Sequence, residues 1–433
     1  MDTRTAWFAE ARFGMFIHWG LSALPARHEW VKHNECIADE AYDRYFDRFD
    51  PDLYDPREWA RAAKAAGMKY AVLTAKHHEG FCLWDSAFTD YKAPATRGAA
   101  AGRDLLREFV DAFRAEGLHV GFYYSLLDWH HPDFTIDRLH PLRNLPRGEI
   151  DRLNAGRDMK RYAKYMRDQV AELLTNYGRI DIMWFDFSYP GPGKPGELPG
   201  KGRDDWESEK LVGLVRSLQP HVLVDNRLDL PGGGDFLTPE QWQYEFPERL
   251  ADGSVGLWEG CQTFSGSWGY HRDEASWKSG KQCVEMLVHH VSRGGNLIMN
   301  VGPTARGRFD SRAKERLGAF AEWIDLHSRS IYGCTAAPAG FVEGTGTRYT
   351  WNPKTKRLYV HVFDWPLVHL ALPGLGRRAK YAQLLGDGSE IVIWNSSESS
   401  SPRDKHCPPD TLMMALPVRR PDVAVPVVEV FLD

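Results

Sequence analysis

Long apolar runs alternate with amphipathic segments over the first three quarters of the chain. The runs are rich in β-branched and aromatic residues, which is typical of buried strands. Five of them predict strands: FGMFIHWG (13–20), YAVLTAKHH (70–78), HVGFYYSLLDWHH (119–131), RIDIMWFDF (179–187) and HVLVDNR (221–227). Because strands that are apolar on both faces are typical of parallel sheets covered by helices, the pattern favours a closed (β/α) barrel over an antiparallel sandwich.

The segments between these strands predict helices. In DPREWARAAKAAGMK (55–69), the apolar residues from Trp59 to Ala66 lie on one helical face, and Gly67 is expected to end the helix. The same reasoning predicts helices over 102–117, 159–178 and 209–220.

From about residue 335 the pattern changes to short alternating or β-branched runs separated by turn residues. The runs are TRYTWNPKTKRLYVHVFDWP, KYAQLLGDGSEIVIWN and VAVPVVEVFLD, without a convincing helix between them. This texture is typical of a small antiparallel β-sandwich. The expected domains are therefore a barrel over residues 1–335 and a sandwich over residues 336–433.

Polar or aromatic side chains follow each of the five predicted barrel strands. They are His18 and Trp19, His77 and His78, Tyr124 with Asp128 and Trp129, Trp184 and Asp186, and Asn226 and Arg227. A single histidine at a strand end is usually structural. Because the carboxyl ends of barrel strands meet at one mouth, five successive strands that end this way predict a functional site there.

Composition narrows the classes of function. The 433 residues carry a net charge of −5, which provides no broad basic surface for nucleic acid. No apolar run approaches the roughly 18 to 20 residues that cross a bilayer, and the amino terminus lacks a secretory pattern. We expect a cytoplasmic protein without nucleic-acid or membrane partners, unless a signal peptide was removed; a homo-oligomer is compatible with the sequence. Six scattered cysteines without a CxxC pair argue against a zinc ribbon or a disulfide scaffold.

Six motifs resemble, in order, the signature blocks of one enzyme family. They are RFGMFIHWGLSALPARHEW, AKHHEGFCLWDS, GFYYSLLDWHHPDF, DIMWFDF, SWGY and GGNLIMNVGP, within about residues 7–335. In these blocks the chain is similar to the retaining α-L-fucosidases, glycoside hydrolase family 29. The resemblance implies a (β/α)8-like TIM barrel followed by a carboxy-terminal antiparallel β-sandwich. It also implies exo-acting removal of terminal α-L-fucose from fucosylated oligosaccharides or glycoconjugates, through a covalent fucosyl-enzyme intermediate and without a cofactor.

Resemblance also implies a pocket for the fucose ring. The matching residues are His18, Glu29, Trp30, His77, His78, Tyr124, Trp184, Arg227 and Trp268. Polar groups would bind the hydroxyls, and tryptophan faces would pack against the C6 methyl group. A metal site is the alternative for His77 and His78. Neighbouring strand residues point to opposite faces, and no HxH or HExxH spacing or third ligand supports an ion, so no metal is expected.

The nucleophile should be a carboxylate at the mouth of the barrel. Asp181 begins a predicted strand, whereas Asp186 ends it and matches the W-x-D setting of the family's nucleophile. Arg227 would help to keep Asp186 ionised. Phe187 stands where many relatives have glycine, which would narrow the pocket.

Retention of configuration requires a second carboxyl group about 5 to 5.5 Å from the nucleophile, acting as acid and then as base. In several relatives the block that matches DFLTPE carries this group at the position of Glu240, and in others Asp235 would be the counterpart. Glu259 of WEGCQTF could take the same role or a structural one. Glu240 is the preferred candidate.

Other functions remain open from the sequence. The covalent intermediate can pass fucose to a sugar hydroxyl, as in a transfucosylase. A non-catalytic fucose-binding protein would lack a carboxylate, whereas Asp186 is present; a zinc-dependent hydrolase would lose activity with a chelator. Linkage preference would depend on loops expected at 31–50, 132–155 and 188–205.

Overall fold

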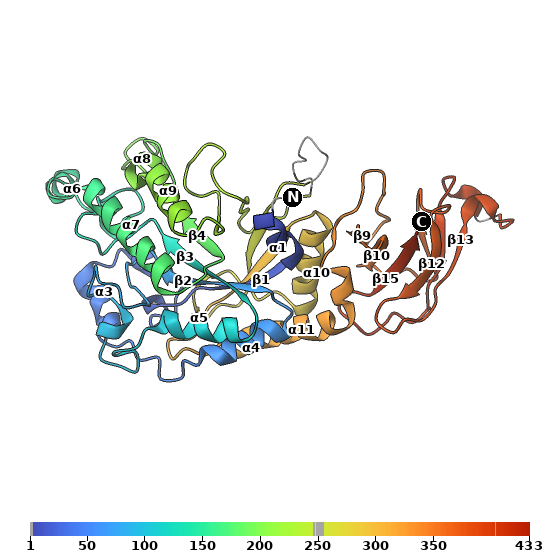
Figure 1. The fold of residues 1–433 in the computed structure, drawn as a ribbon, viewed down its shortest axis with the longest axis horizontal. Helices are drawn as coiled ribbons and strands as arrows, with labels where there is room; N and C mark the ends of the chain where they lie inside the picture. The colour runs from blue at the N-terminus through green and yellow to red at the C-terminus, as the bar shows by residue number, and fades with distance from the viewer. Residues whose placement is uncertain (1–2, 246, 248–254, 403) are drawn as a thin grey trace.

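A computed structural model describes residues 3–245, 247, 255–402 and 404–433 of the chain. Seven strands form one parallel sheet in the order β5-β4-β3-β2-β1-β7-β6 (Figure 1). They are β1 (Phe13–Ile17), β2 (Tyr70–Lys76), β3 (His119–Ser125), β4 (Ile182–Asp186), β5 (Leu223–Val224), β6 (Glu259–Thr263) and β7 (Asn296–Val301). The five strands predicted from the sequence are thereby confirmed. Strands β1, β2 and β5 end before the polar residues expected after them, whereas β3 ends one residue after Tyr124 and β4 ends on Asp186.

Residues 236–240 connect the two edges of this sheet. Isolated parallel bridges pair Asp225 with Phe236 beside β5, and Leu237 with Trp258 beside β6. A further bridge joins Glu240 to Cys261 within β6. The predicted (β/α) barrel is confirmed, with its eighth position held by isolated bridges instead of a regular strand.

Helices cover the outside of the sheet. The principal ones are α4 (Pro56–Ala65), α5 (Leu105–Ala115), α7 (Met159–Asn176), α9 (Ser208–Leu218), α10 (Gly280–Ser292) and α11 (Ser311–His327). Shorter ones are α1 (Thr3–Ala11), α2 (Val31–Asn34), α3 (Asp39–Phe46), α6 (Arg147–Asn154) and α8 (Arg203–Trp206). Asp55 caps α4 by accepting a hydrogen bond from the Arg57 amide, and Gly67, at φ 92°, follows its last turn. No helix in the described part of the chain is long and apolar enough to cross a membrane.

Strand side chains alternate between the barrel interior and the helical layer. Phe16, Tyr123 and Trp184 belong to the apolar cluster inside the barrel. Their neighbours Phe122 and Tyr124 belong to the larger cluster between the sheet and the helices. Because side chains alternate along a strand, two adjacent tyrosines must face opposite sides of the sheet.

The remaining strands form two antiparallel sheets at one end of the molecule (Figure 1). One has the order β12-β15-β10-β9-β8, and the other has the order β11-β14-β13. The strands are β8 (Thr335–Ala336), β9 (Thr347–Asn352), β10 (Arg357–Val362), β11 (His369–Leu372), β12 (Ala379–Leu384), β13 (Val392–Asn395), β14 (Leu412–Ala415) and β15 (Val427–Leu432). They enclose an apolar core of their own.

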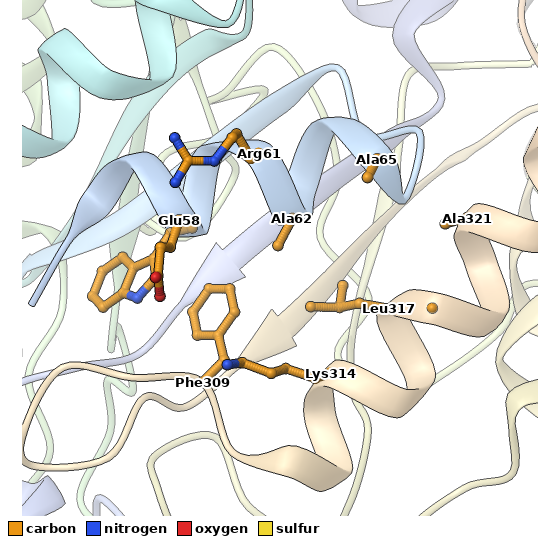
Figure 2. Close-up of a pocket in the computed structure, with 10 residues that line it drawn as sticks. Glu58, Arg61, Ala62, Ala65, Phe309, Lys314, Leu317 and Ala321 are labelled. Carbon is orange, nitrogen blue, oxygen red and sulfur yellow. The ribbon is translucent and has the colours of Figure 1, made fainter. Parts of the chain in front are cut away.

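A surface groove of about 440 Å³ lies between α4 and α11 (Figure 2). Trp59 and Phe309, which stack on each other, line the groove, and Glu58 and Lys314 add opposite charges to it. The groove belongs to the helical layer and includes none of the residues predicted for the site.

Candidate active site

A pocket opens at the carboxyl ends of the barrel strands. Its lining residues are Phe16, His18, Glu29, Trp30, His77, Tyr123, Trp184, Asp186, Phe187, Glu240, Cys261 and Trp268. Eight of these residues were predicted from the sequence as catalytic or sugar-binding. They come from strand ends and loops that are far apart in the chain, so the barrel brings them together.

Asp186 ends β4 and accepts three hydrogen bonds. Its Oδ1 accepts from the Phe187 amide at 2.9 Å and from Arg227 Nη1 at 2.8 Å, and its Oδ2 accepts from the Tyr123 hydroxyl at 3.1 Å. Burial raises the pKa of Asp186 above its ordinary value; Arg227 and Tyr123 oppose the rise, whereas the charge of Glu240 adds to it. These three bonds hold the carboxylate in place. Oδ2 accepts only one of them, so its second lone pair is not used by these bonds.

Phe187 has a backbone φ of 80°, which is rare for a bulky residue. Its ring lies against Trp30 and the two histidines that follow β2. Such strain is often found at functional sites. The same residue donates its amide hydrogen to the Asp186 carboxylate.

Arg227 links Asp186 to Glu240. Its Nη1 lies 2.8 Å from Asp186 Oδ1 and 2.7 Å from Glu240 Oε2, so these two oxygens are at most 5.5 Å apart. Its guanidinium carbon lies 4.6 Å from the centre of the Trp184 ring, and Thr238 accepts two further hydrogen bonds from it. A separation of at most 5.5 Å matches retaining glycosidases, since inverting enzymes hold their carboxyl groups about 6.5 to 9.5 Å apart.

The two alternative acid/base candidates lie outside this pocket. Asp235 forms ion pairs with Arg4 and Arg216, both at 2.6 Å, and these cations hold its pKa below the ordinary value although burial opposes them. Glu259 is fully buried inside the barrel, where Trp184 donates to it at 3.3 Å and Tyr70 donates to its other oxygen. Burial raises the pKa of Glu259 to about 7. Both side chains support the fold around the site.

His18 is positioned by Asn300. The Asn300 amide nitrogen donates to the Trp268 carbonyl at 2.6 Å, which turns its Oδ1 toward His18 Nδ1, also at 2.6 Å. We therefore assign the ring hydrogen to Nδ1, which leaves Nε2 as an acceptor for a hydroxyl group. Burial lowers the pKa of His18 to about 3, so the ring is neutral.

Glu29 lies between the loop before α2 and the loop that carries Trp268. Its Oε2 accepts a hydrogen bond from the Gly269 amide at 2.7 Å, and its Oε1 lies 3.2 Å from His28 Nδ1. Burial raises the pKa of Glu29. Its neighbour Trp30 forms a wall of the pocket.

His77 and His78 take different positions. His77 lines the pocket and stacks on Tyr123, whereas His78 lies behind it, stacked on Trp129 with ring centres 4.0 Å apart. Glu79 Oε2 lies 3.8 Å from Nδ1 of His77 and 3.6 Å from Nδ1 of His78, so these three residues form a group that could hold a metal ion. Glu79 is therefore a third potential ligand, which the sequence analysis did not consider.

Tyr124 is placed outside the pocket, contrary to the sequence-based expectation. Its side chain faces the helical layer, where its hydroxyl donates to Gln169 at 2.7 Å and its ring lies beneath Lys76. Tyr123 takes the pocket position instead. The register of β3 against β4 pairs Tyr123 with Trp184, and paired residues of neighbouring strands face the same side.

Comparisons with known proteins give a consistent result. The family model described as Alpha-L-fucosidase matches residues 2–329. Plasma alpha-L-fucosidase of Rattus norvegicus is 29% identical over 423 residues, which cover 91% of this chain and 85% of that protein.

Solved structures agree over the whole chain. Alpha-L-fucosidase isoenzyme 1 of Paenibacillus thiaminolyticus is 45% identical with a TM-score of 0.89, covering 100% of this chain and 99% of that one. A GH29 alpha-L-fucosidase of Bacteroides thetaiotaomicron is 27% identical with a TM-score of 0.82, covering 100% and 97%. It was solved as a trapped covalent intermediate with 2-fluoro-fucosyl fluoride in a glutamate-to-glutamine mutant. The chain belongs to the α-L-fucosidase family, the retaining enzymes of glycoside hydrolase family 29.

Proposed function

We propose that this chain is an exo-acting α-L-fucosidase in which Asp186 is the nucleophile and Glu240 is the acid/base. The observation that carries the assignment is that Arg227 holds one oxygen of each carboxyl group, at 2.8 and 2.7 Å. Glu240 is also the more exposed of the two, at 43% against 14% for Asp186. An exposed acid beside a buried nucleophile suits a pocket that encloses one terminal sugar and leaves the departing group in solvent.

The reaction follows from these positions. Asp186 attacks the anomeric carbon of fucose while Glu240 gives its proton to the glycosidic oxygen, so the C–O bond breaks and a fucosyl ester forms. Glu240 then takes a proton from water, whose oxygen attacks the same carbon and releases Asp186. Two inversions at that carbon retain the α configuration.

The substrates we propose are fucosylated oligosaccharides or glycoconjugates. Hydroxyl groups of the sugar would bind Nε2 of His18, the ring of His77 and the Glu29 carboxylate, while Trp30, Trp184 and Trp268 supply apolar faces. Transfer of fucose to a sugar hydroxyl is the alternative outcome of the second step, and product analysis with added acceptor measures the balance.

Replacement of the nucleophile tests the proposal. We expect Asp186→Gly to lower turnover by several orders of magnitude, and added azide to restore part of it by forming a fucosyl azide of β configuration. EDTA should leave the wild-type rate unchanged. Near-normal hydrolysis by the variant would show that Asp186 is not the nucleophile. If EDTA abolishes wild-type activity and zinc restores it, a metal site at His77, His78 and Glu79 is favoured instead.

A further inference from the structure

Trp242 is exposed beside the pocket. Of the tryptophans that the structure describes, it is the one whose surface is largely open to solvent, at 64%. No ring contact or hydrogen bond of its indole is seen among the described residues. Tryptophan combines a large apolar face with one polar N–H group and is enriched at binding interfaces.

The backbone around Trp242 is fixed to the carboxyl end of β6. The Gln241 amide donates to the Cys261 carbonyl at 3.0 Å, and the Gln241 side chain donates to Thr263, the last residue of β6, at 2.8 Å. The Gln262 side chain donates to the Trp242 carbonyl at 3.2 Å. Gln241, at φ 52°, turns the chain between Glu240 and Trp242. Trp242 therefore stands on the rim of the barrel mouth on a held segment.

Trp242 follows Glu240 by two residues. A general acid must lie beside the glycosidic oxygen, between the fucose ring and the group that departs. Since the pocket walls enclose the fucose side of Glu240, the departing group extends toward the exposed side of the mouth. A residue held on the rim next to Glu240 is placed to meet that group.

We propose that Trp242 is the platform on which the first sugar of the leaving group stacks. The proposal rests on the fucosidase assignment above and adds the residue that would bind the leaving group. An indole accepts the apolar C–H face of a sugar ring without requiring one pattern of hydroxyls. Trp242 lies outside the three loops from which the sequence predicted such contacts.

Two substrates separate this role from catalysis. Fucosyl fluoride has no leaving-group sugar, whereas a fucosyllactose carries one. We expect Trp242→Ala to lower the ratio of kcat/KM for fucosyllactose to that for fucosyl fluoride about tenfold, mainly through KM. Trp242→Tyr should restore most of the ratio, because it retains an aromatic face. The fucosyllactose isomer that the wild type cleaves fastest is the probe.

Leu237→Ala is the matched control. Leu237 is also exposed, at 42%, in the same extended segment, but it pairs at the start of β6, away from the mouth. Leu237→Ala should leave the ratio of kcat/KM for fucosyllactose to that for fucosyl fluoride unchanged. An unchanged ratio for Trp242→Ala, or an equal change for Leu237→Ala, would overturn the platform while the fucosidase assignment stands. If the wild type cleaves neither fucosyl fluoride nor any fucosyllactose, the fucosidase assignment is wrong, and the platform proposal falls with it.

Discussion

The nucleophile depends on the balance of groups around one carboxylate. Burial and the charge of Glu240 raise the pKa of Asp186, and the Arg227 and Tyr123 hydrogen bonds lower it. Asp186 must be ionised to attack, so activity is lost as the pH falls through its pKa. The acidic limb of the kcat/KM profile should therefore lie above the ordinary range of an aspartate.

Removal of one donor should move that limb. Tyr123→Phe deletes the hydrogen bond to Asp186 Oδ2 and keeps the ring that stacks on His77. Because that bond stabilises the ionised form, we expect the acidic limb to shift to higher pH by about half a unit to one unit. The measurement is kcat/KM for an aryl fucoside across pH. Tyr124→Phe removes a hydroxyl bound to Gln169 and is the control; an equal shift in that variant would contradict the assignment.

The role of Glu240 is tested through the leaving group. A general acid matters most when the leaving group is poor, so Glu240→Gln should impair cleavage of natural fucosides strongly and cleavage of an activated aryl fucoside much less. Glu259→Gln and Asp235→Asn should lower both rates alike, because these residues support Trp184 and the ion pairs to α1 and α9. If either of those two variants shows strong leaving-group dependence and Glu240→Gln does not, the acid/base role belongs to the residue replaced in that variant.

Residue types could be predicted from the sequence better than side-chain directions. Strand-end position and motif resemblance placed Asp186 and His18 at the mouth. They selected Tyr124 where the structure places Tyr123 in the pocket. That choice depends on the register of β3 against β4, which is set by pairing between distant segments. Glu259 stands at the start of β6, and strand starts lie away from the mouth of a barrel. The same reasoning was already used to reject Asp181, so it was the available signal for Glu259.

At the scale of elements, the loops after β2 and β3 are fixed by a buried ion pair. Lys76 Nζ lies 2.8 Å from Asp128 Oδ2, and both side chains are almost fully buried. Burial, the largest single influence, raises the pKa of Asp128, but the charge and hydrogen bond of Lys76 together with the charges of His131 and His130 outweigh burial and hold the pKa below the ordinary value. Asp128 also accepts hydrogen bonds from the His130 and His131 amides. The lysine of the KHH motif therefore holds the loop that places His77.

Loss of one partner should destabilise the fold. Lys76→Met leaves the Asp128 charge buried without its counterion, for which a cost of about 3 to 5 kcal/mol is expected. Asp128 contributes stability while it is ionised, so the loss should shrink as the pH falls through its depressed pKa. Denaturant unfolding at several pH values measures this, with Lys64→Met, from the exposed pair with Glu116, as the control. Equal losses in the two variants would contradict the argument.

Elements whose apolar residues recur with a clear spacing along the sequence could be predicted, whereas segments held only by isolated bridges could not. Strands β1 to β4 and helices α4 and α5 follow from uninterrupted apolar runs and caps. Residues 236–240 have too few apolar positions to read as a strand, although they close the barrel and carry Glu240. Their conformation is set by edges that are brought together only when the rest of the sheet has formed.

For the whole molecule, the carboxy-terminal sheets cover part of the barrel's helical layer. Trp323 of α11 donates its indole hydrogen to the Val425 carbonyl at 2.7 Å and stacks on His327. Val425 and Val427 belong to the same apolar cluster as the barrel helices. Arg293, which follows α10, pairs with Glu343 at 2.9 Å. We therefore expect the sandwich region to stabilise the barrel without entering the pocket.

Trp323→Ala tests that coupling. The side chain is buried, at 2% exposure, and its removal leaves a cavity at the junction and the Val425 carbonyl without its donor. We expect the free energy of unfolding to fall by about 3 to 5 kcal/mol. Since Trp323 is not among the pocket residues, kcat/KM of the folded protein should change little. Trp365→Ala is the control, because that indole also donates to a backbone carbonyl, at Pro417, but lies in a more exposed site. If the two variants lose the same stability, burial at this junction does not hold the two parts together. If instead Trp323→Ala lowers kcat/KM with little loss of stability, the sandwich region acts on the site through α11.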